Sequence, residues 1–214
     1  MSYKVIENFF NSSLYNELKN FFLSDDSLWI LNRKIVGNNT CELFSKQSKI
    51  DIDEKIIDHE IYYKKNNMKF NKYYDYQFVC PLYNINDSKN ICNNIMRDKL
   101  NKIINSNELI NLNISKILRI KTNIAPYCGI ELSNHNLHTD IIIDRYPNEN
   151  REKFKTLIIY FNTCNGYTII KKYDKKIYSK DNRAVIFNTY LEHAGTNTTN
   201  DKYRLVLNIN YIEK

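Results

Sequence analysis

The spacing of apolar residues changes along the chain. Near the N-terminus they recur at intervals of three or four positions, which is typical of the buried face of a helix. Asn11 or Ser12 is suited to cap this helix, because a short polar side chain accepts a hydrogen bond from the first turn. A short strand is expected just before it, over residues 5–10. The apolar face of the helix comprises Leu14, Leu18, Phe21 and Phe22.

A second helix is predicted over residues 86–108, where Ile91, Ile95 and Leu100 form a partial apolar stripe. From about residue 115 the chain changes to short runs of branched and aromatic residues separated by turns, which predict a sandwich or barrel of strands. Asn165-Gly166 is a strong hairpin signal, and KKYDKK at 171–176 is expected to form a solvated hairpin end. The expected strands are residues 116–123, 136–140, 156–161, 167–172, 183–187 and 203–212.

Length and composition favour one domain over residues 1–214. A chain of this size can bury a sizeable core, and its four glycines and three prolines leave no linker-like stretch. We expect residues 1–110 to form a helical support region and residues 111–214 to form the core that carries the chemistry. Oligomeric state is not readable from this sequence.

Cysteine usage and hydropathy indicate a cytoplasmic protein with reduced thiols and no membrane partner. The cysteines are odd in number and show no CxxC spacing, which suits neither a disulfide framework nor a zinc knuckle. No apolar stretch reaches the roughly 18 to 20 residues of a membrane span, and the N-terminus lacks a signal-peptide pattern. The cysteines are Cys41, Cys80, Cys92, Cys128 and Cys164.

The net charge of +7 would suit a nucleic-acid partner if the lysines were clustered. They are scattered, and the chain is crowded with Asn, Ile and Tyr, a composition typical of an AT-rich genome. Charge therefore gives only weak support to a nucleic-acid partner.

His138 and Asp140 flank Thr139 in a segment expected to be a strand. Because residues i and i+2 of a strand share a face, the imidazole and the carboxylate would project together. Two imidazoles and one carboxylate occupy one face of an octahedron and leave three positions open, the preference of non-haem Fe(II) oxygenases, whereas structural zinc closes its shell, usually with cysteines. His193 is the natural third ligand.

Arg204 opens the expected strand 203–212, eleven residues after His193. Its planar guanidinium is permanently charged and suits a two-pronged grip on the far carboxylate of a dicarboxylic acid. If alternation persists, Asn208 and Asn210 share its face and would line the interior, where they would contact a co-substrate or an ordered water.

These residues, in this order and with their flanks, resemble the 2-oxoglutarate- and Fe(II)-dependent oxygenases, and specifically their prolyl-hydroxylase-like branch. HxD alone carries little information, whereas the full set is specific. The likeness spans most of the chain, and its last two stretches resemble small members from phage and other viral genomes, which would place the protein in a host cytoplasm. The stretches are VIENFFNSSLYNELKNFF, YQFVCPLYNIN, LRIKTN before HTD, LIIYFNTCNGYTII after it, and NRAVIFNTYLEHAGTNTTNDKYRLVLNINYI.

The resemblance implies a fold, cofactors and residue roles. The fold would be mostly β with flanking helices, a double-stranded β-helix or jelly roll whose core at 111–214 binds iron and 2-oxoglutarate. The catalytic metal ligands would be His138, Asp140 and His193, with Fe(II), 2-oxoglutarate as co-substrate and O2. Arg204 would bind the distal carboxylate of 2-oxoglutarate, and Tyr160 would hydrogen-bond the same group.

The implied reaction is hydroxylation of a C–H bond, with formation of succinate and CO2, and the branch favours a protein or peptide substrate with a side chain such as proline. Three alternatives stay open: a nucleobase oxygenase that stacks bases on Tyr73, Tyr74 and Tyr76, a small-metabolite oxygenase, and a non-catalytic jelly-roll module with a vestigial metal site.

A few further residues carry weaker expectations. His135 should face away from the ligands, His59 is expected to be solvated, and Arg183 is expected to make no more than a surface ion pair. The role of Tyr127 stays open. The polar stretch 144–155, just after HTD, is the best candidate for a lid over the site.

Overall fold

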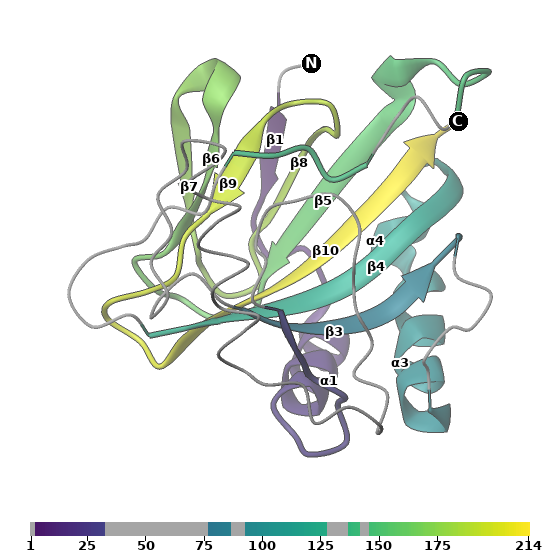
Figure 1. The fold of residues 1–214 in the computed structure, drawn as a ribbon. Helices are drawn as coiled ribbons and strands as arrows, with labels where there is room; N and C mark the ends of the chain where they lie inside the picture. The colour runs from purple at the N-terminus through teal and green to yellow at the C-terminus, as the bar shows by residue number, and fades with distance from the viewer. Residues whose placement is uncertain (1–2, 33–76, 87–92, 128–136, 142–145) are drawn as a thin grey trace, which may run out of the picture.

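The computed structural model describes residues 3–32, 77–86, 93–127, 137–141 and 146–214. In these ranges the strands form two antiparallel sheets (Figure 1). In spatial order the seven-stranded sheet contains β1 (Tyr3–Ile6), β8 (Ala184–Asn188), β5 (Phe154–Tyr160), β10 (Tyr203–Glu213), β4 (Ile114–Pro126), β3 (Gln77–Asn84) and β2 (Ile30–Asn32). The three-stranded sheet contains β7 (Lys175–Tyr178), β6 (Tyr167–Ile170) and β9 (His193–Gly195).

The first predicted helix is confirmed as α1 (Ser12–Phe22), with the side chain of Asn11 accepting the backbone N–H of Leu14. The second is shorter than predicted. It becomes α3 (Asn94–Ile104) and a separate turn of helix, α4 (Asn107–Ile110). The cause is capping, because Asn93 and Ser106 each accept a backbone N–H three residues on and thereby start a new helix. None of the described helices is long and apolar enough to cross a membrane.

Strict alternation along β5 and β10 divides the core into two layers. Leu157, Ile159 and Phe161 face the helices, together with the odd-numbered residues of β10 from Leu205 to Tyr211. Ile158, Tyr160 and Val206 face the small sheet. The helices therefore cover one face of the large sheet, and β6, β7 and β9 cover the other (Figure 1). This mostly β arrangement of two facing antiparallel sheets is the jelly roll that was expected.

Several strand boundaries differ from the predictions. The first strand covers Tyr3–Ile6 rather than 5–10, because Asn8 takes a left-handed conformation (φ 50°) and Phe9 and Phe10 bond to Asn182 instead. β6 ends at Ile170, and the KKYDKK run closes the β6–β7 hairpin with mostly exposed side chains, as predicted. The segment 136–140 is not a regular strand in its described part, residues 137–140, which contains only one isolated bridge, between His138 and His193.

The hairpin predicted at Asn165-Gly166 is wrong. The strands on either side, β5 and β6, belong to different sheets, so this segment crosses between them. Its polar groups bond to a distant loop: the Asn165 backbone N–H donates to Asn200 Oδ1 (2.9 Å), and Asn165 Nδ2 donates to Thr199 Oγ1 (2.6 Å). The local signal was overridden because each strand finds its partners far along the chain.

Candidate metal centre and anion pocket

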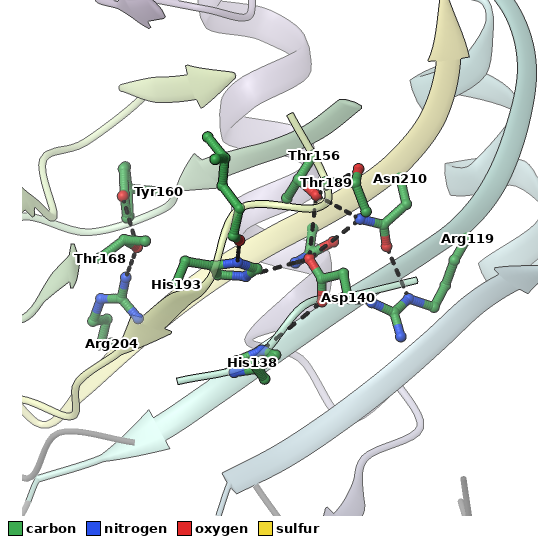
Figure 2. A network of polar contacts seen from close by, with 12 residues as sticks. Arg119, His138, Asp140, Thr156, Tyr160, Thr168, Thr189, His193, Arg204 and Asn210 are labelled. Atoms are coloured by element: carbon green, nitrogen blue, oxygen red, sulfur yellow. Dashed lines mark hydrogen bonds and ion pairs between the residues drawn. The ribbon is translucent and has the colours of Figure 1, made fainter. Parts of the chain in front are cut away.

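The structure brings His138, Asp140 and His193 together between the two sheets (Figure 2). One ligand atom from each lies within 4.8 Å of the others. His193 Nε2 is 3.5 Å from Asp140 Oδ2, and His138 Nε2 is 4.0 Å from Asp140 Oδ1. The backbones of the two histidines exchange N–H···O bonds of 3.0 Å, which hold their rings 4.6 Å apart. This single β-bridge to β9 thus brings the ligand side chains together, although the HTD segment is not the regular strand that was expected.

His193 is fixed with one nitrogen directed at the carboxylate. Its Nδ1 lies 3.1 Å from the carbonyl oxygen of Leu191, which can accept a hydrogen bond from a proton on Nδ1. In that tautomer the lone pair of Nε2 faces Asp140, the arrangement that a metal-ligating imidazole needs. The ring is buried, and Phe187 packs edge-on against it at 4.8 Å.

The Asp140 carboxylate is buried, and both of its oxygens accept hydrogen bonds. Oδ1 accepts from Arg119 Nη2 at 2.7 Å. Burial alone would raise the pKa of this carboxyl, but the Arg119 guanidinium holds it well below its usual range. The group is therefore ionised, as a metal ligand must be. Oδ2 accepts from three donors at 3.1–3.4 Å: Asn208 Nδ2, Asn210 Nδ2 and Thr156 Oγ1.

A pocket extends from the triad to Arg204, whose guanidinium is buried. Nη2 donates to Thr168 Oγ1 at 2.8 Å and Nη1 to the Thr196 carbonyl at 3.4 Å, but Nε has no hydrogen-bond partner among the described residues. In the described part of the chain no carboxylate pairs with Arg204, and burial lowers its pKa. A buried cation without an anion is costly, so the pocket is suited to an anionic ligand. Its other lining residues are Gln77, Lys121, Asn123, Ala125, His138, Asp140, Ile158, Thr168, His193, Gly195, Val206 and Asn208.

Tyr160 lies behind the pocket wall rather than in it. It is fully buried, its ring centroid is 5.3 Å from the Arg204 guanidinium, and its hydroxyl donates to Thr168 Oγ1 at 2.9 Å (Figure 2). Because Arg204 also donates to that oxygen, both lone pairs of the Thr168 hydroxyl are used. Its own proton is left for an acceptor in the pocket. Tyr160 thus contacts both Thr168 and Arg204, and a hydrogen bond from Tyr160 to a co-substrate stays a prediction.

The two asparagines of β10 share the inward face with Arg204, as alternation predicts. Asn208 lines the pocket, and its buried Oδ1 accepts no hydrogen bond from the part of the chain that the structure describes. Asn210 is fully buried and bonds to Asp140 and Thr156, while its Oδ1 accepts from Arg119 Nε at 3.0 Å. Both side chains therefore orient the carboxylate, and contact of either with a co-substrate stays a prediction.

Sequence reasoning missed Arg119, Thr156 and Thr168. One signal was available for the first: in LRIKTN, polar residues occupy every second position, Arg119, Lys121 and Asn123, which predicts a polar inner face on β4. The two threonines carry no comparable signal, because threonine is common in strands for its branched shape alone.

Gly166 is needed for the close approach of Arg204. A Cβ atom at this position would lie 2.5 Å from the Asn197 carbonyl oxygen and 2.6 Å from Arg204 Cδ. The glycine that suggested a hairpin therefore makes room for the stem of the guanidinium.

The described part of the lid candidate is bound to the loop before His193. In the 3-10 turn Arg151–Lys153, the Glu152 carboxylate accepts from the Tyr190 hydroxyl at 3.0 Å and from Asn188 Nδ2 at 2.7 Å. The Arg151 guanidinium lies 4.2 Å from the Tyr190 ring centroid. Residues 144 and 145 lie outside the described ranges, and a lid role for 144–155 stays a prediction.

The remaining predicted residues lie away from the pocket or outside the described ranges. Tyr127 is 52% exposed, and its backbone N–H bonds to the Lys202 carbonyl. Arg183 pairs with Glu7 at 2.8 Å, the surface ion pair that was expected. Cys80 and Cys164 are buried, and neither forms a disulfide with a described residue. The residues outside the described ranges are His59, Tyr73, Tyr74, Tyr76, His135, Cys41, Cys92 and Cys128.

No protein-family model matches the sequence, and no curated protein matches it. Solved structures do. HygX from Streptomyces hygroscopicus, with nickel and 2-oxoglutarate bound, has a TM-score of 0.54 at 7% identity over 100% of this chain and 83% of that chain. A prolyl hydroxylase from Trichoplax adhaerens, in complex with a hypoxia inducible factor peptide fragment, has a TM-score of 0.49 at 14% identity over 99% and 84%.

The viral collagen prolyl hydroxylase of Paramecium Bursaria Chlorella virus-1, in its 2-oxoglutarate complex, has a TM-score of 0.48 at 14% identity, over 100% of this chain and 97% of that chain. At identities this low, structural similarity establishes a shared fold and nothing finer. The chain shares the jelly-roll fold of HygX, and its His138, Asp140 and His193 side chains are close enough together to hold a metal ion.

Proposed function

We propose that this protein is a 2-oxoglutarate- and Fe(II)-dependent dioxygenase. One observation carries the proposal: a single pocket joins a two-histidine, one-carboxylate group to a buried guanidinium that has no carboxylate partner among the described residues. The triad suits a ferrous ion with open positions, and the guanidinium suits the far carboxylate of a dicarboxylic acid. No cysteine belongs to the described group, so a closed structural zinc site is a poor fit.

The residues present fit both groups. His138, Asp140 and His193 would hold the iron, with Asp140 kept ionised by Arg119 and the His193 ring oriented by the Leu191 carbonyl. Arg204 would hold the distal carboxylate of 2-oxoglutarate through its fork of N–H groups, and the free Thr168 O–H would donate to the same carboxylate. Tyr160 would act through Thr168, which it orients.

Part of the pocket wall is apolar. Ile158 and Val206 line the pocket, and both side chains are buried in the layer between the sheets. A ligand packed against them would exclude water there, which strengthens the electrostatic attraction of Arg204 for an anion. When bound, iron and 2-oxoglutarate supply the oxidising chemistry that consumes O2, releases succinate and CO2, and hydroxylates a C–H bond.

For the substrate we propose a protein side chain such as a peptidyl proline. The support is the sequence likeness to the prolyl-hydroxylase-like branch, carried by HTD, the stretch around His193 and the Arg204 strand. Nucleobases and small metabolites are the enzymatic alternatives. A non-catalytic binding module is disfavoured because the ligand triad, its hydrogen-bond partners and the guanidinium are all intact.

Succinate formation tests the proposal directly. Protein loaded anaerobically with Fe(II) would be mixed with 2-oxoglutarate, ascorbate and O2, first alone and then with proline-containing peptides, single-stranded oligonucleotides or free amino acids. We expect slow succinate formation alone and faster formation with the peptides. If only oligonucleotides or only amino acids accelerate succinate formation, they replace peptides as the proposed substrate class. If folded, iron-loaded protein forms no succinate under any condition, the proposal is overturned. His138→Ala is the inactive control.

Gly166→Ala should weaken 2-oxoglutarate binding without affecting the metal. The added methyl group has no room beside the Asn197 carbonyl and Arg204 Cδ, so the Arg204 side chain must move from the pocket end. We expect the KM for 2-oxoglutarate to rise about tenfold, equivalent to about 1.4 kcal/mol. Fe(II) affinity, measured in the absence of 2-oxoglutarate, should not change. An unaltered KM would show that Arg204 is not the group that binds the co-substrate, or that it tolerates displacement.

A further inference from the structure

We propose that Arg119 is a positioning residue of the metal site, which sets the orientation of the Asp140 carboxylate and thereby the affinity for the metal. The inference rests on the proposed role of Asp140 as a metal ligand. Nothing in the HTD pattern points to this arginine, because it lies 21 residues before Asp140, on β4.

Arg119 is held by two partners at once. It lies on β4 directly opposite Asn210 of β10 in the strand register. Its Nε donates to Asn210 Oδ1 at 3.0 Å, and its Nη2 donates to Asp140 Oδ1 at 2.7 Å (Figure 2). A guanidinium is rigid and planar, so fixing one N–H group fixes the direction of the other. The pairing of β4 with β10 thus fixes the Arg119 guanidinium, and the guanidinium in turn fixes the position of Asp140 Oδ1.

Asp140 depends on such contacts because its backbone is not part of a sheet ladder. In the described segment 137–141 only His138 pairs with a neighbouring strand. The side chains around the carboxylate therefore supply the orientation that a strand would otherwise supply. Asn208 and Asn210 hold Oδ2 with neutral amides at 3.1 and 3.2 Å, whereas Arg119 makes the shorter, charge-assisted bond to Oδ1.

A positioning role and a purely electrostatic role of Arg119 predict opposite changes in metal affinity when Arg119 is removed. A cation beside the site repels a divalent metal, so if charge alone mattered, removing Arg119 would tighten metal binding. If Arg119 positions the ligand, its removal should weaken binding, because loss of a group that hydrogen-bonds a metal ligand costs about 10–100-fold in affinity. Lys121 offers a matched control for charge: it lies two residues further along the same face of β4, lines the pocket, and acts on Asp140 through its charge.

The test is anaerobic calorimetry of the full chain with Fe(II), and with Co(II) to follow its visible d–d bands. We expect Arg119→Met to raise the metal Kd about 10–100-fold and to change the Co(II) band shape. The Kd of Arg119→Lys should lie between those of Arg119→Met and the parent, since lysine keeps the charge but lacks the planar fork of N–H groups. Lys121→Met should bind metal as tightly as the parent or more tightly.

The outcomes separate this inference from the proposed function. If the parent protein binds neither metal, or binds both equally well after His138→Ala, the metal site itself is wrong. If the parent binds and His138→Ala does not, an unchanged or lower Kd in folded Arg119→Met would overturn the positioning role alone. Should Arg119→Met fail to fold, the same comparison is made with Arg119→Lys, for which a Kd and Co(II) spectrum equal to those of the parent would overturn it.

Discussion

Replacing Asp140 by alanine should abolish Fe(II) binding and turnover. The carboxylate is the one anionic ligand of the triad, and its pKa is held well below the usual range, so it is charged at neutral pH and offsets the charge of the metal. Removing even a group that only hydrogen-bonds a ligand costs about 10–100-fold in metal affinity, so loss of the ligand itself should exceed about 100-fold. The measurements are Fe(II) affinity by anaerobic calorimetry and succinate formation.

Asp140→Asn is the matched control for the fold. It keeps the volume of the side chain and an oxygen for Arg119, whereas alanine leaves the guanidinium without its acceptor. Both variants should lose metal binding, and the asparagine variant should melt closer to the parent than the alanine variant. Native Fe(II) affinity in either folded variant would refute the assignment of Asp140 as a ligand.

Replacing Arg204 by methionine should raise the requirement for 2-oxoglutarate while sparing the metal. Hydrogen bonds to charged groups contribute about 1.5–3 kcal/mol each, so losing the guanidinium should raise the KM for 2-oxoglutarate about 10–100-fold. Methionine is used because it refills much of the space of the buried stem. The KM of Arg204→Lys should lie between those of the parent and Arg204→Met, since lysine keeps the charge but not the planar fork.

The effect of Arg204→Met on the Tm distinguishes a ligand-binding role of Arg204 from a structural role. Arg204 is buried, its Nε has no hydrogen-bond partner among the described residues, and no described carboxylate pairs with it. A buried cation in this position costs free energy in the ligand-free protein. Arg204→Met should therefore leave the Tm of the ligand-free protein unchanged or raise it, and should remove most of the Tm increase caused by 2-oxoglutarate with Co(II). A large fall in the Tm of the ligand-free variant would mark Arg204 as a structural residue.

Elements whose information is local could be predicted from the sequence. α1 begins where Asn11 caps it, and its apolar spacing predicts the buried face. The alternation of β10 places Arg204, Asn208 and Asn210 on one face, as expected. The predicted boundary of a helix is wrong where one polar side chain caps a new helix. Ser106 caps α4, so the second predicted helix ends earlier than expected.

Features that depend on which strands become neighbours could not be predicted. Asn165-Gly166 carries a hairpin signal, yet β5 pairs with β10 and β8 and leaves the segment as a crossover. Arg119 reaches Asp140 only because β4 pairs with β10 in a register that sets Arg119 opposite Asn210. Likewise, Tyr160 contacts Thr168 because β6 lies across from β5 in the facing sheet.

The most direct test of the central claim is anaerobic titration of the metal-free protein with Fe(II) and 2-oxoglutarate, followed by visible absorption. If one pocket chelates both, the weak metal-to-ligand charge-transfer band of the ternary complex should appear at stoichiometric Fe(II). That band should vanish in His138→Ala and should require more 2-oxoglutarate in Arg204→Met. Absence of the band in folded parent protein, or its persistence in His138→Ala, would contradict a shared site for iron and 2-oxoglutarate.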